Sequence, residues 1–170
     1  MDIIKSVFDA VAGLRPSTID FVTSAGVEGT GGEAVTAGVT VQGIQLKDNR
    51  IGSTKWLTFY GAGAGVGVGI PIGGSMSTPD FPSVGSKVLR GTTNIGTLEL
   101  ADLIGGLGQI WSFSAAAGAG VSGSLVFFNN KVPPPLPPFL FKAALWVEGV
   151  CIASPGVGCM GYHGIWTLES

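Results

Sequence analysis

Few side chains in this sequence could perform chemistry, and they form no known catalytic pattern. His163 is the single histidine and stands in Gly161-Tyr162-His163-Gly164. The sequence contains no Gly-x-Ser-x-Gly nucleophile elbow and no Gly-Lys-Ser/Thr phosphate-binding loop. One histidine and two cysteines do not supply the ligands of a zinc site, so we predict no metal and no cofactor. The sequence therefore predicts a protein that is not an enzyme.

The two cysteines raise one covalent question. Cys151 and Cys159 flank a turn at Ser154-Pro155-Gly156, between the apolar segments 141–152 and 159–168. In a hairpin of suitable register the two sulfurs would lie close enough to bridge, whereas a slip of one residue would put them on opposite faces. Cys151–Cys159 is thus a candidate disulfide. The alternative is two reduced, buried thiols, which the lack of a signal peptide favours.

An internal repeat is the clearest structural signal in the chain. Residues 56–70 and 111–125 share a tryptophan and then Ala-Gly-Ala-Gly-Val at matching positions. Side chains in both copies alternate with a period of two, which is typical of a β-strand. The Trp56 face of the first copy carries Thr, Tyr, Ala, Val and Ile, and the other face carries Leu57, Phe59 and glycines. We expect each copy to bend at its glycines, with aromatic rings over the glycines of a neighbouring strand.

The same segments support a second interpretation. Residues 56–79 and 103–130 carry no charge, and small residues recur in them at every fourth position, as in closely packed membrane helices. Pro71 interrupts the first segment, and each glycine disfavours a helix by about 1 kcal/mol relative to alanine. We therefore favour strands and retain a membrane-inserting helical hairpin as the alternative.

The remaining sequence predicts one β domain preceded by a helix. Residues 1–16 form an amphipathic N-terminal helix, because their apolar side chains recur at helical spacing before Gly13 and Pro16. Residues 17–170 contain several expected strands and turns, a short helix at 97–104 and an extended proline tract at 132–139. The predicted fold class is all-β: a compact antiparallel, glycine-rich β-barrel of about eight strands.

Composition limits the partners that such a domain can bind. Of 170 residues, 29 are glycine and 12% are charged, and the formal net charge is −2. Nine Lys and Arg residues offer no basic surface for nucleic acid and no polybasic cluster for anionic lipid. The sequence has no signal peptide, which predicts a cytoplasmic location or export by a non-classical route. The oligomeric state stays open.

A group of motifs in the C-terminal third resembles those of a known family. Phe113 lies in an expected strand, Phe127-Phe128-Asn129-Asn130 ends it, and the last expected strand is rich in glycine and finishes near Trp166. Together with the segment 97–104, these motifs resemble the virulence-associated protein (Vap) family of rhodococci. This sequence departs from the pattern by its proline tract, its two cysteines and its lack of a signal peptide. The resemblance implies a compact eight-stranded barrel with a membrane-associated or interaction-based role in virulence or toxicity, and it implies no catalytic residues.

These observations predict a binding protein that acts through apolar contacts. The partner is a lipid or membrane surface, a hydrophobic ligand or another protein. The candidate contact residues are the aromatic ends of the repeats, which combine a large apolar area with polar groups on Trp and Tyr. They are Trp56, Phe59, Tyr60, Trp111 and Phe113. For each of them the alternative is a place in the core. The alternative functions are a membrane-inserting, pore-forming protein that uses the two uncharged repeats, and a self-assembling structural subunit.

Overall fold

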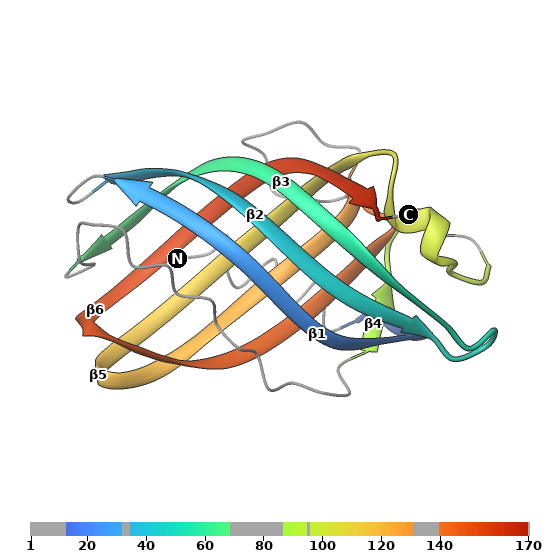
Figure 1. Ribbon diagram of the computed structural model, residues 1–170, viewed down its shortest axis with the longest axis horizontal. Coiled ribbons are helices and arrows are strands. Elements are labelled where there is room, and N and C mark those ends of the chain that lie inside the picture. Colours follow the sequence, from blue (N-terminus) through green and yellow to red (C-terminus); the bar gives the residue numbers. More distant parts are fainter. Residues whose placement is uncertain (1–12, 32–34, 69–86, 95, 131–139, 170) are drawn as a thin grey trace.

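The computed structural model describes residues 13–31, 35–68, 87–94, 96–130 and 140–169, which form an all-β fold (Figure 1). Only the backbone is described at 27–31, 36, 67–68, 113–122 and 148–157. The strands are β1 (Arg15–Gly31), β2 (Val35–Asp48), β3 (Ser53–Val68), β4 (Lys87–Arg90), β5 (Leu107–Asn130) and β6 (Ala143–Leu168). A 3₁₀ helix, η1 (Leu100–Leu103), precedes β5.

The first three strands form an antiparallel meander. Within it Val27 of β1 pairs with Val41 of β2, which pairs in turn with Tyr60 of β3. The turn from β2 to β3 begins at Asp48, whose carboxylate accepts a hydrogen bond from the backbone N–H of Arg50 at 3.0 Å. Gly52 then adopts a φ of 66°, in the left-handed region that glycine enters without strain. This local chemistry fixes the register of the hairpin.

The two longest strands each cross the barrel twice. The first arm of β5 (107–116) pairs with the second arm of β6 (156–168), and the second arm of β5 (118–130) pairs with the first arm of β6 (143–153). The hydroxyls of Ser112 and Ser124 form a hydrogen bond of 3.0 Å, so the arms of β5 lie side by side. In Figure 1 these arms are the yellow and orange ribbons, and the arms of β6 flank them.

The remaining pairings close the sheet into a barrel. β3 pairs with the second arm of β6, from Leu57 opposite Leu168 to Val68 opposite Val157. β4 pairs with β1 and with the start of β6. The order around the barrel is therefore β1, β2, β3, second arm of β6, first and second arms of β5, first arm of β6, and β4. The structure is a closed antiparallel eight-strand barrel, which confirms the predicted all-β barrel.

The two copies of the internal repeat have different structures. Residues 56–68 form one uninterrupted stretch of β3, whereas residues 111–125 fold back near Gly118, where the register shifts. The expected bend occurs only in the second copy, because β3 is held along both edges by β2 and β6. The alternative of a helical hairpin is wrong for these residues. No helix in the described part of the chain is long and apolar enough to cross a membrane.

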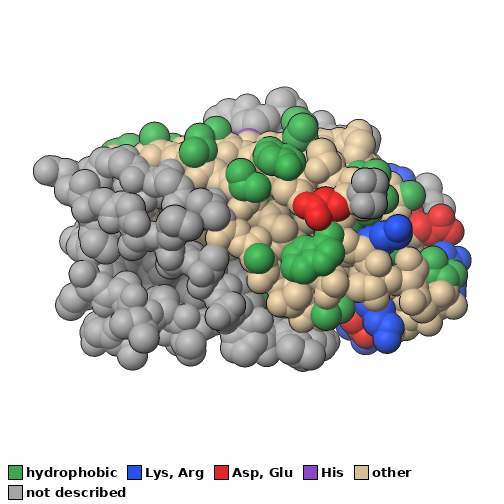
Figure 2. All heavy atoms as spheres, in the orientation of Figure 1, with side chains coloured by type: hydrophobic (Ala, Val, Ile, Leu, Met, Phe, Trp, Pro, Cys, Tyr) green, Lys and Arg blue, Asp and Glu red, His purple; other side chains and the backbone are tan. Residues whose placement is uncertain are grey.

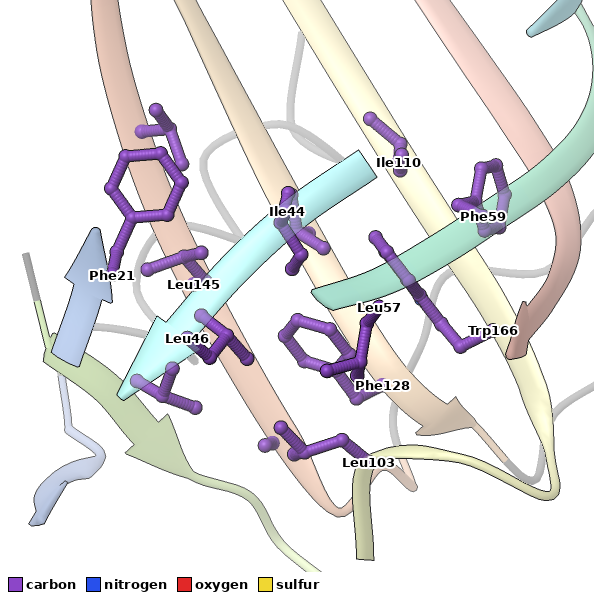
Figure 3. Close-up of a cluster of buried hydrophobic side chains, with 14 of the residues drawn as sticks. Phe21, Ile44, Leu46, Leu57, Phe59, Leu103, Ile110, Phe128, Leu145 and Trp166 are labelled. Atoms are coloured by element: carbon purple, nitrogen blue, oxygen red, sulfur yellow. The ribbon is translucent and has the colours of Figure 1, made fainter. Parts of the chain in front are cut away.

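A hydrophobic core fills the end of the barrel near η1 (Figure 3). The ring of Trp166 packs between Phe59 and Phe128, with centroid distances of 5.0 and 4.9 Å. Its indole N–H donates a hydrogen bond of 3.2 Å to the carbonyl of Phe127, so the buried polar group is satisfied. This contact joins β6 to the second arm of β5 across the barrel interior. Other core side chains are Ile19, Phe21, Ile44, Leu46, Leu57, Leu103, Ile110, Val126, Leu145 and Tyr162.

The two predicted helices have different outcomes. The segment 97–104 contains η1, where the backbone N–H of Glu99 donates to the carboxylate of Asp102 at 3.0 Å. Residues 1–12 of the predicted N-terminal helix lie outside the described residues. Arg15 and Pro16 belong to β1, so the predicted helix boundary at residue 16 is wrong, because both residues pair with β4 as extended chain.

Candidate binding face

A row of large apolar side chains crosses four neighbouring strands on the outer surface of the barrel. The register pairs Val41 of β2 with Tyr60 of β3, Tyr60 with Ile165 of β6, and Ile165 with Leu107 of β5. In that order the four residues are 45%, 50%, 52% and 38% exposed. Directly opposed residues on adjacent strands have Cβ atoms about 5 Å apart. The row is therefore one continuous apolar strip.

More apolar residues extend this strip along β2 and β3, away from the β2–β3 turn. Val39 and Val35 of β2 are 64% and 69% exposed, and Val66 of β3 is 61% exposed. Exposed alanines lie between them. We call the whole set the apolar face: Val35, Ala37, Val39, Val41, Tyr60, Ala62, Ala64, Val66, Leu107 and Ile165. Isolated exposed valines are ordinary, whereas a contiguous group of exposed apolar side chains is a candidate interaction surface.

The core residues of β2 and β3 decide which side chains point outward. Ile44 and Leu46 of β2 and Leu57 and Phe59 of β3 are at most 2% exposed and lie inside the barrel. Because successive side chains of a strand point to opposite faces, Tyr60 must then point outward, with alternate residues on either side of it. The Trp56 face of the first repeat is thus the outer face of the barrel.

Charged side chains gather at the opposite end of the barrel, near η1 and the β2–β3 turn. There Lys87 pairs with Asp20 at 2.6 Å, and Arg50 pairs with Glu99 at 3.1 Å. Hydrogen bonds from Lys87 and then from Asn49 lower the pKa of the Asp20 carboxyl below its usual value of 3.8. In Figure 2 the blue and red side chains of the described residues lie toward this right-hand end. The sequence has no charged residue at 35–46 or 56–68, so the β2 and β3 parts of the apolar face are neutral.

The structure separates the three predicted contact residues of β3. Tyr60 lies on the apolar face, and Trp56 lies half-buried on the same outer side of the strand. Phe59 is 0% exposed, and its ring packs on Trp166 inside the barrel. We therefore correct the assignment of Phe59 from a contact residue to a core residue, since its strand position points it inward.

Trp111, one of the two predicted contact residues of β5, is half-buried on the outer side of the barrel. Its indole N–H donates to the Gln109 side chain at 3.0 Å, and its ring meets His163 edge-on with a centroid distance of 6.4 Å. Ring atoms of Trp111 lie 3.4 Å from the point where Gly161 would carry a Cβ. Trp56 lies over Gly43 of β2 in the same way, also at 3.4 Å. The expectation that both repeat tryptophans cover glycines of adjacent strands is thus confirmed.

The four predicted aromatic residues whose side chains the structure describes do not form one site. Trp56 and Tyr60 share β3, Trp111 lies two strands away, and the side chain of Phe113 is outside the described set. Sequence reasoning also missed the aliphatic residues of the apolar face. Strand parity could have found some of them: once Ile44 and Leu46 are assigned to the core, the odd-numbered valines of β2 must point outward.

Cys159 is a free, half-buried thiol, so the candidate disulfide with Cys151 is not formed. The predicted hairpin would have placed the two cysteines opposite each other. Instead β5 lies between the arms of β6, so that Cys151 pairs with Gly120 and Cys159 pairs with Phe113. Two intervening strands separate the cysteines by roughly 14 Å, well beyond the reach of a disulfide.

His163 occupies a packed position in the second arm of β6. It pairs with Ala62 of β3 and with Gln109 of β5, and its ring contacts Trp111. Its Nδ1 atom is buried and makes no hydrogen bond to the described residues. Among those residues, no group of three or more His, Cys, Asp and Glu side chains is placed to hold a metal ion. The described surroundings of His163 are those of a packed side chain between strands.

Comparison of the chain with protein-family models, with curated proteins and with solved structures found no match. Among the described residues, the apolar face is an outer feature of the barrel that is neutral and continuous across four strands, from Val41 to Leu107 beside η1.

Proposed function

We propose that the protein is a non-enzymatic β-barrel binding protein that attaches to a lipid membrane through its apolar face. The observation that carries this proposal is the exposed row Val41, Tyr60, Ile165 and Leu107, which runs unbroken across four strands. Such a row loses contact with water when hydrocarbon covers it, and this loss is the driving force of attachment.

The size of the face supports a reversible attachment. Fully burying a Val, Leu or Ile side chain contributes about 1.5–3 kcal/mol, so a half-exposed one contributes roughly 1 kcal/mol when it becomes covered. The burial of the large exposed members of the face acts against the cost of lost motion on binding, and only the small surplus appears as binding free energy. The expected strength is comparable to that of a single acyl chain, which holds a protein on a membrane reversibly.

The charge pattern and the fold class add support. A neutral face needs no anionic lipid, because apolar burial rather than attraction to headgroup charge drives the binding. The relationship to the Vap family, with its implied role in virulence or toxicity, belongs to the same proposal. It is supported by the closed eight-strand antiparallel barrel, which is the architecture that the resemblance implies.

Vesicle flotation tests this function with two matched lysine variants. Val39 on the apolar face and Ile51 in the β2–β3 turn are both 64% exposed, so lysine fits at either site without disturbing the core. With phosphatidylcholine vesicles we expect the wild type and Ile51→Lys to float alike. Val39→Lys should partition into the vesicles about tenfold more weakly. The lysine must either bury its charge in hydrocarbon or hold this part of the apolar face away from the lipid.

Several results would contradict the proposal. They are failure of the wild type to float, or equal flotation of both lysine variants. Sedimentation of the same three proteins without vesicles tests whether a second copy of the chain, rather than a membrane, binds the apolar face. A concentration-dependent oligomer that Val39→Lys alone disrupts, together with no flotation, would assign the face to a second copy of the chain. A hydrophobic ligand or protein partner that co-purifies with the wild type and not with Val39→Lys would likewise replace the membrane.

A further inference from the structure

The polarity of β2 reverses along its length. Near the β2–β3 turn, Leu46 is 0% exposed inside the barrel and its neighbour Lys47 points outward into water. Further along the same strand, Thr40 is 5% exposed on the inner side, and its neighbour Val39 is 64% exposed on the outer side. One end of the strand therefore places its apolar side chains inside, and the other end places them outside.

The neighbouring strand β3 shows the same reversal. After the core residues Leu57 and Phe59, the inward positions of β3 are Gly61, Gly63 and Gly65, while exposed Ala and Val residues occupy the outward positions. At this level the inner side of β6 still carries the buried core residues Tyr162 and Met160, opposite Gly63 and Gly65, whereas the inner sides of β1 and β5 carry hydroxyl groups. They belong to Ser24 of β1, which is 9% exposed, and to Ser112 and Ser124 of β5, which hydrogen-bond to each other.

This reversal has a direct physical meaning. A barrel wall that faces water carries polar residues outside and apolar residues inside, as the end near η1 does. A wall that faces lipid carries apolar residues outside and small or polar residues inside. The two arrangements meet within single strands here, at Ile44–Val41 of β2 and at Phe59–Tyr60 of β3.

We propose that the outer wall formed by β2, β3, the second arm of β6 and the first arm of β5 enters the hydrocarbon of the bilayer, while the ion-paired end near η1 stays in water. This inference rests on the proposed membrane attachment and adds its orientation. The barrel stands tilted, with Val39 and Ala62 deep and with Lys47 and Lys55 at or above the headgroups.

Aromatic residues mark the level at which the wall passes from headgroups to hydrocarbon. Tyr60 is 50% exposed and stands where the polarity of β3 reverses. Trp56 lies on the same outer side nearer the charged end, and Trp111 lies half-buried on the outer side of β5. Trp and Tyr collect at membrane interfaces because a large apolar ring and a hydrogen-bonding group are both satisfied there.

The length of β3 indicates how deeply the wall reaches into the bilayer, and the positions of Glu28 and Glu148 in the sequence indicate which strands stay outside it. The nine residues from Tyr60 to Val68 rise roughly 20 Å along the membrane normal if β3 is tilted by about 45°, which reaches past the midplane of a hydrocarbon core about 30 Å thick. Glu28 of β1 and Glu148 in the first arm of β6 lie outside the four-strand wall. The wall therefore enters on one side of the barrel rather than around its whole circumference.

Depth-resolved fluorescence tests the orientation. In a Cys151→Ser/Cys159→Ser background that still floats, single cysteines at Val39→Cys and Lys47→Cys would carry an environment-sensitive fluorophore. Both positions are exposed on the same side of β2, about 26 Å apart along the strand. In phosphatidylcholine vesicles we expect a blue shift and a severalfold rise in emission at residue 39, with strong quenching by lipids brominated near the middle of the acyl chain. Residue 47 should respond little.

A second pair on β3 repeats the measurement independently. Ala62 lies opposite Val39, and the exposed Thr54 lies opposite Lys47, so Ala62→Cys and Thr54→Cys should reproduce the deep and shallow responses. Equal or reversed quenching within both pairs, while the labelled proteins still float, would overturn the orientation and leave the membrane attachment standing. Loss of flotation in the unlabelled wild type would instead remove the attachment itself.

Discussion

Phe59 and Tyr60 are adjacent in the chain and occupy opposite environments. Phe59 is 0% exposed against Trp166, and Tyr60 is 50% exposed on the apolar face. Strand alternation predicts that the two rings separate, but it does not predict which of them is buried. The choice is made by side chains from distant strands, because Trp166 of β6 and Phe128 of β5 complete the core only on the Phe59 side.

Gly65 is expected to tolerate no side chain. A Cβ at this position would collide with the backbone carbonyl of Cys159 and with the side chain of Met160 on the adjacent strand. Overpacking of this kind costs about 1–3 kcal/mol, so Gly65→Ala should lower the Tm by several degrees. Gly13→Ala is the control, because a Cβ there meets no atom within 4 Å. Equal Tm values for both variants in thermal melts would contradict the close approach of β6 to β3.

Asp20 is expected to add a pH-dependent part to the stability. Its pKa is lowered by hydrogen bonds from Lys87 and Asn49, so the unfolded chain binds more protons than the folded one near the usual value of 3.8. The stabilisation is therefore complete above that pH and is lost as pH falls through the lowered pKa. In melts at a series of pH values, Asp20→Asn should be less stable than wild type at pH 7 and equal to it at low pH. In a Lys87→Met background, the difference in stability at pH 7 between Asp20 and Asp20→Asn should be smaller.

The difference between β3 and β5 shows what sequence similarity leaves undecided. The two copies of the repeat share their tryptophan and Ala-Gly-Ala-Gly-Val, and both form strands as their alternation predicts. Whether a glycine-rich strand runs straight or folds back depends on its neighbours. β3 has a partner along each edge, whereas β5 supplies one of its own partners by folding near Gly118. The predicted Cys151–Cys159 disulfide is wrong because it also depends on strand neighbours. No local sequence pattern indicates that β5 inserts between the arms of β6.

A designed disulfide would test the fold-back of β5. The hydroxyls of Ser112 and Ser124 are 3.0 Å apart, so cysteines at both positions should bridge spontaneously in a Cys151→Ser/Cys159→Ser background. In a straight strand these residues would be separated by about 40 Å. Mass spectrometry under non-reducing conditions should therefore find the Ser112→Cys/Ser124→Cys bridge. Two free thiols after mild oxidation of the folded protein would show that the arms are not adjacent.

At the scale of the whole molecule, the barrel divides its chemistry by position along the axis. The end near η1 combines the largest core side chains with the ion pairs of Asp20, Arg50, Lys87 and Glu99. The apolar face begins at Leu107 beside this end and extends toward the other end along β2 and β3. The uncharged segments 56–79 and 103–130 are visible in the sequence, but this division along the axis was not predicted from them. The outward direction of the apolar residues could not be predicted, because it depends on closure of the barrel by strands far apart in sequence.

Salt should have little effect on attachment to vesicles. The apolar face has no charged residue, and the charged end has partners of both signs within reach. Screening by salt weakens attraction between charges and leaves apolar burial almost unchanged. Flotation with phosphatidylcholine vesicles should thus give similar bound fractions at low and high ionic strength. Binding that disappears at high salt would indicate an electrostatic mechanism and would contradict the role of the face.

The pairing of β3 with the second arm of β6 has a consequence for folding during translation. Thr58 and Thr167, which hydrogen-bond across this pairing, are 109 positions apart in the chain. Translation at about 5–20 residues per second takes several seconds to cover that distance, whereas a β-hairpin forms in about 1–10 μs. The β1–β3 meander can therefore form several seconds before the second arm of β6 is synthesised. During that time its valines are exposed and one edge of β3 is unpaired. We expect the nascent chain in that interval to be the form most prone to aggregation and most dependent on chaperones.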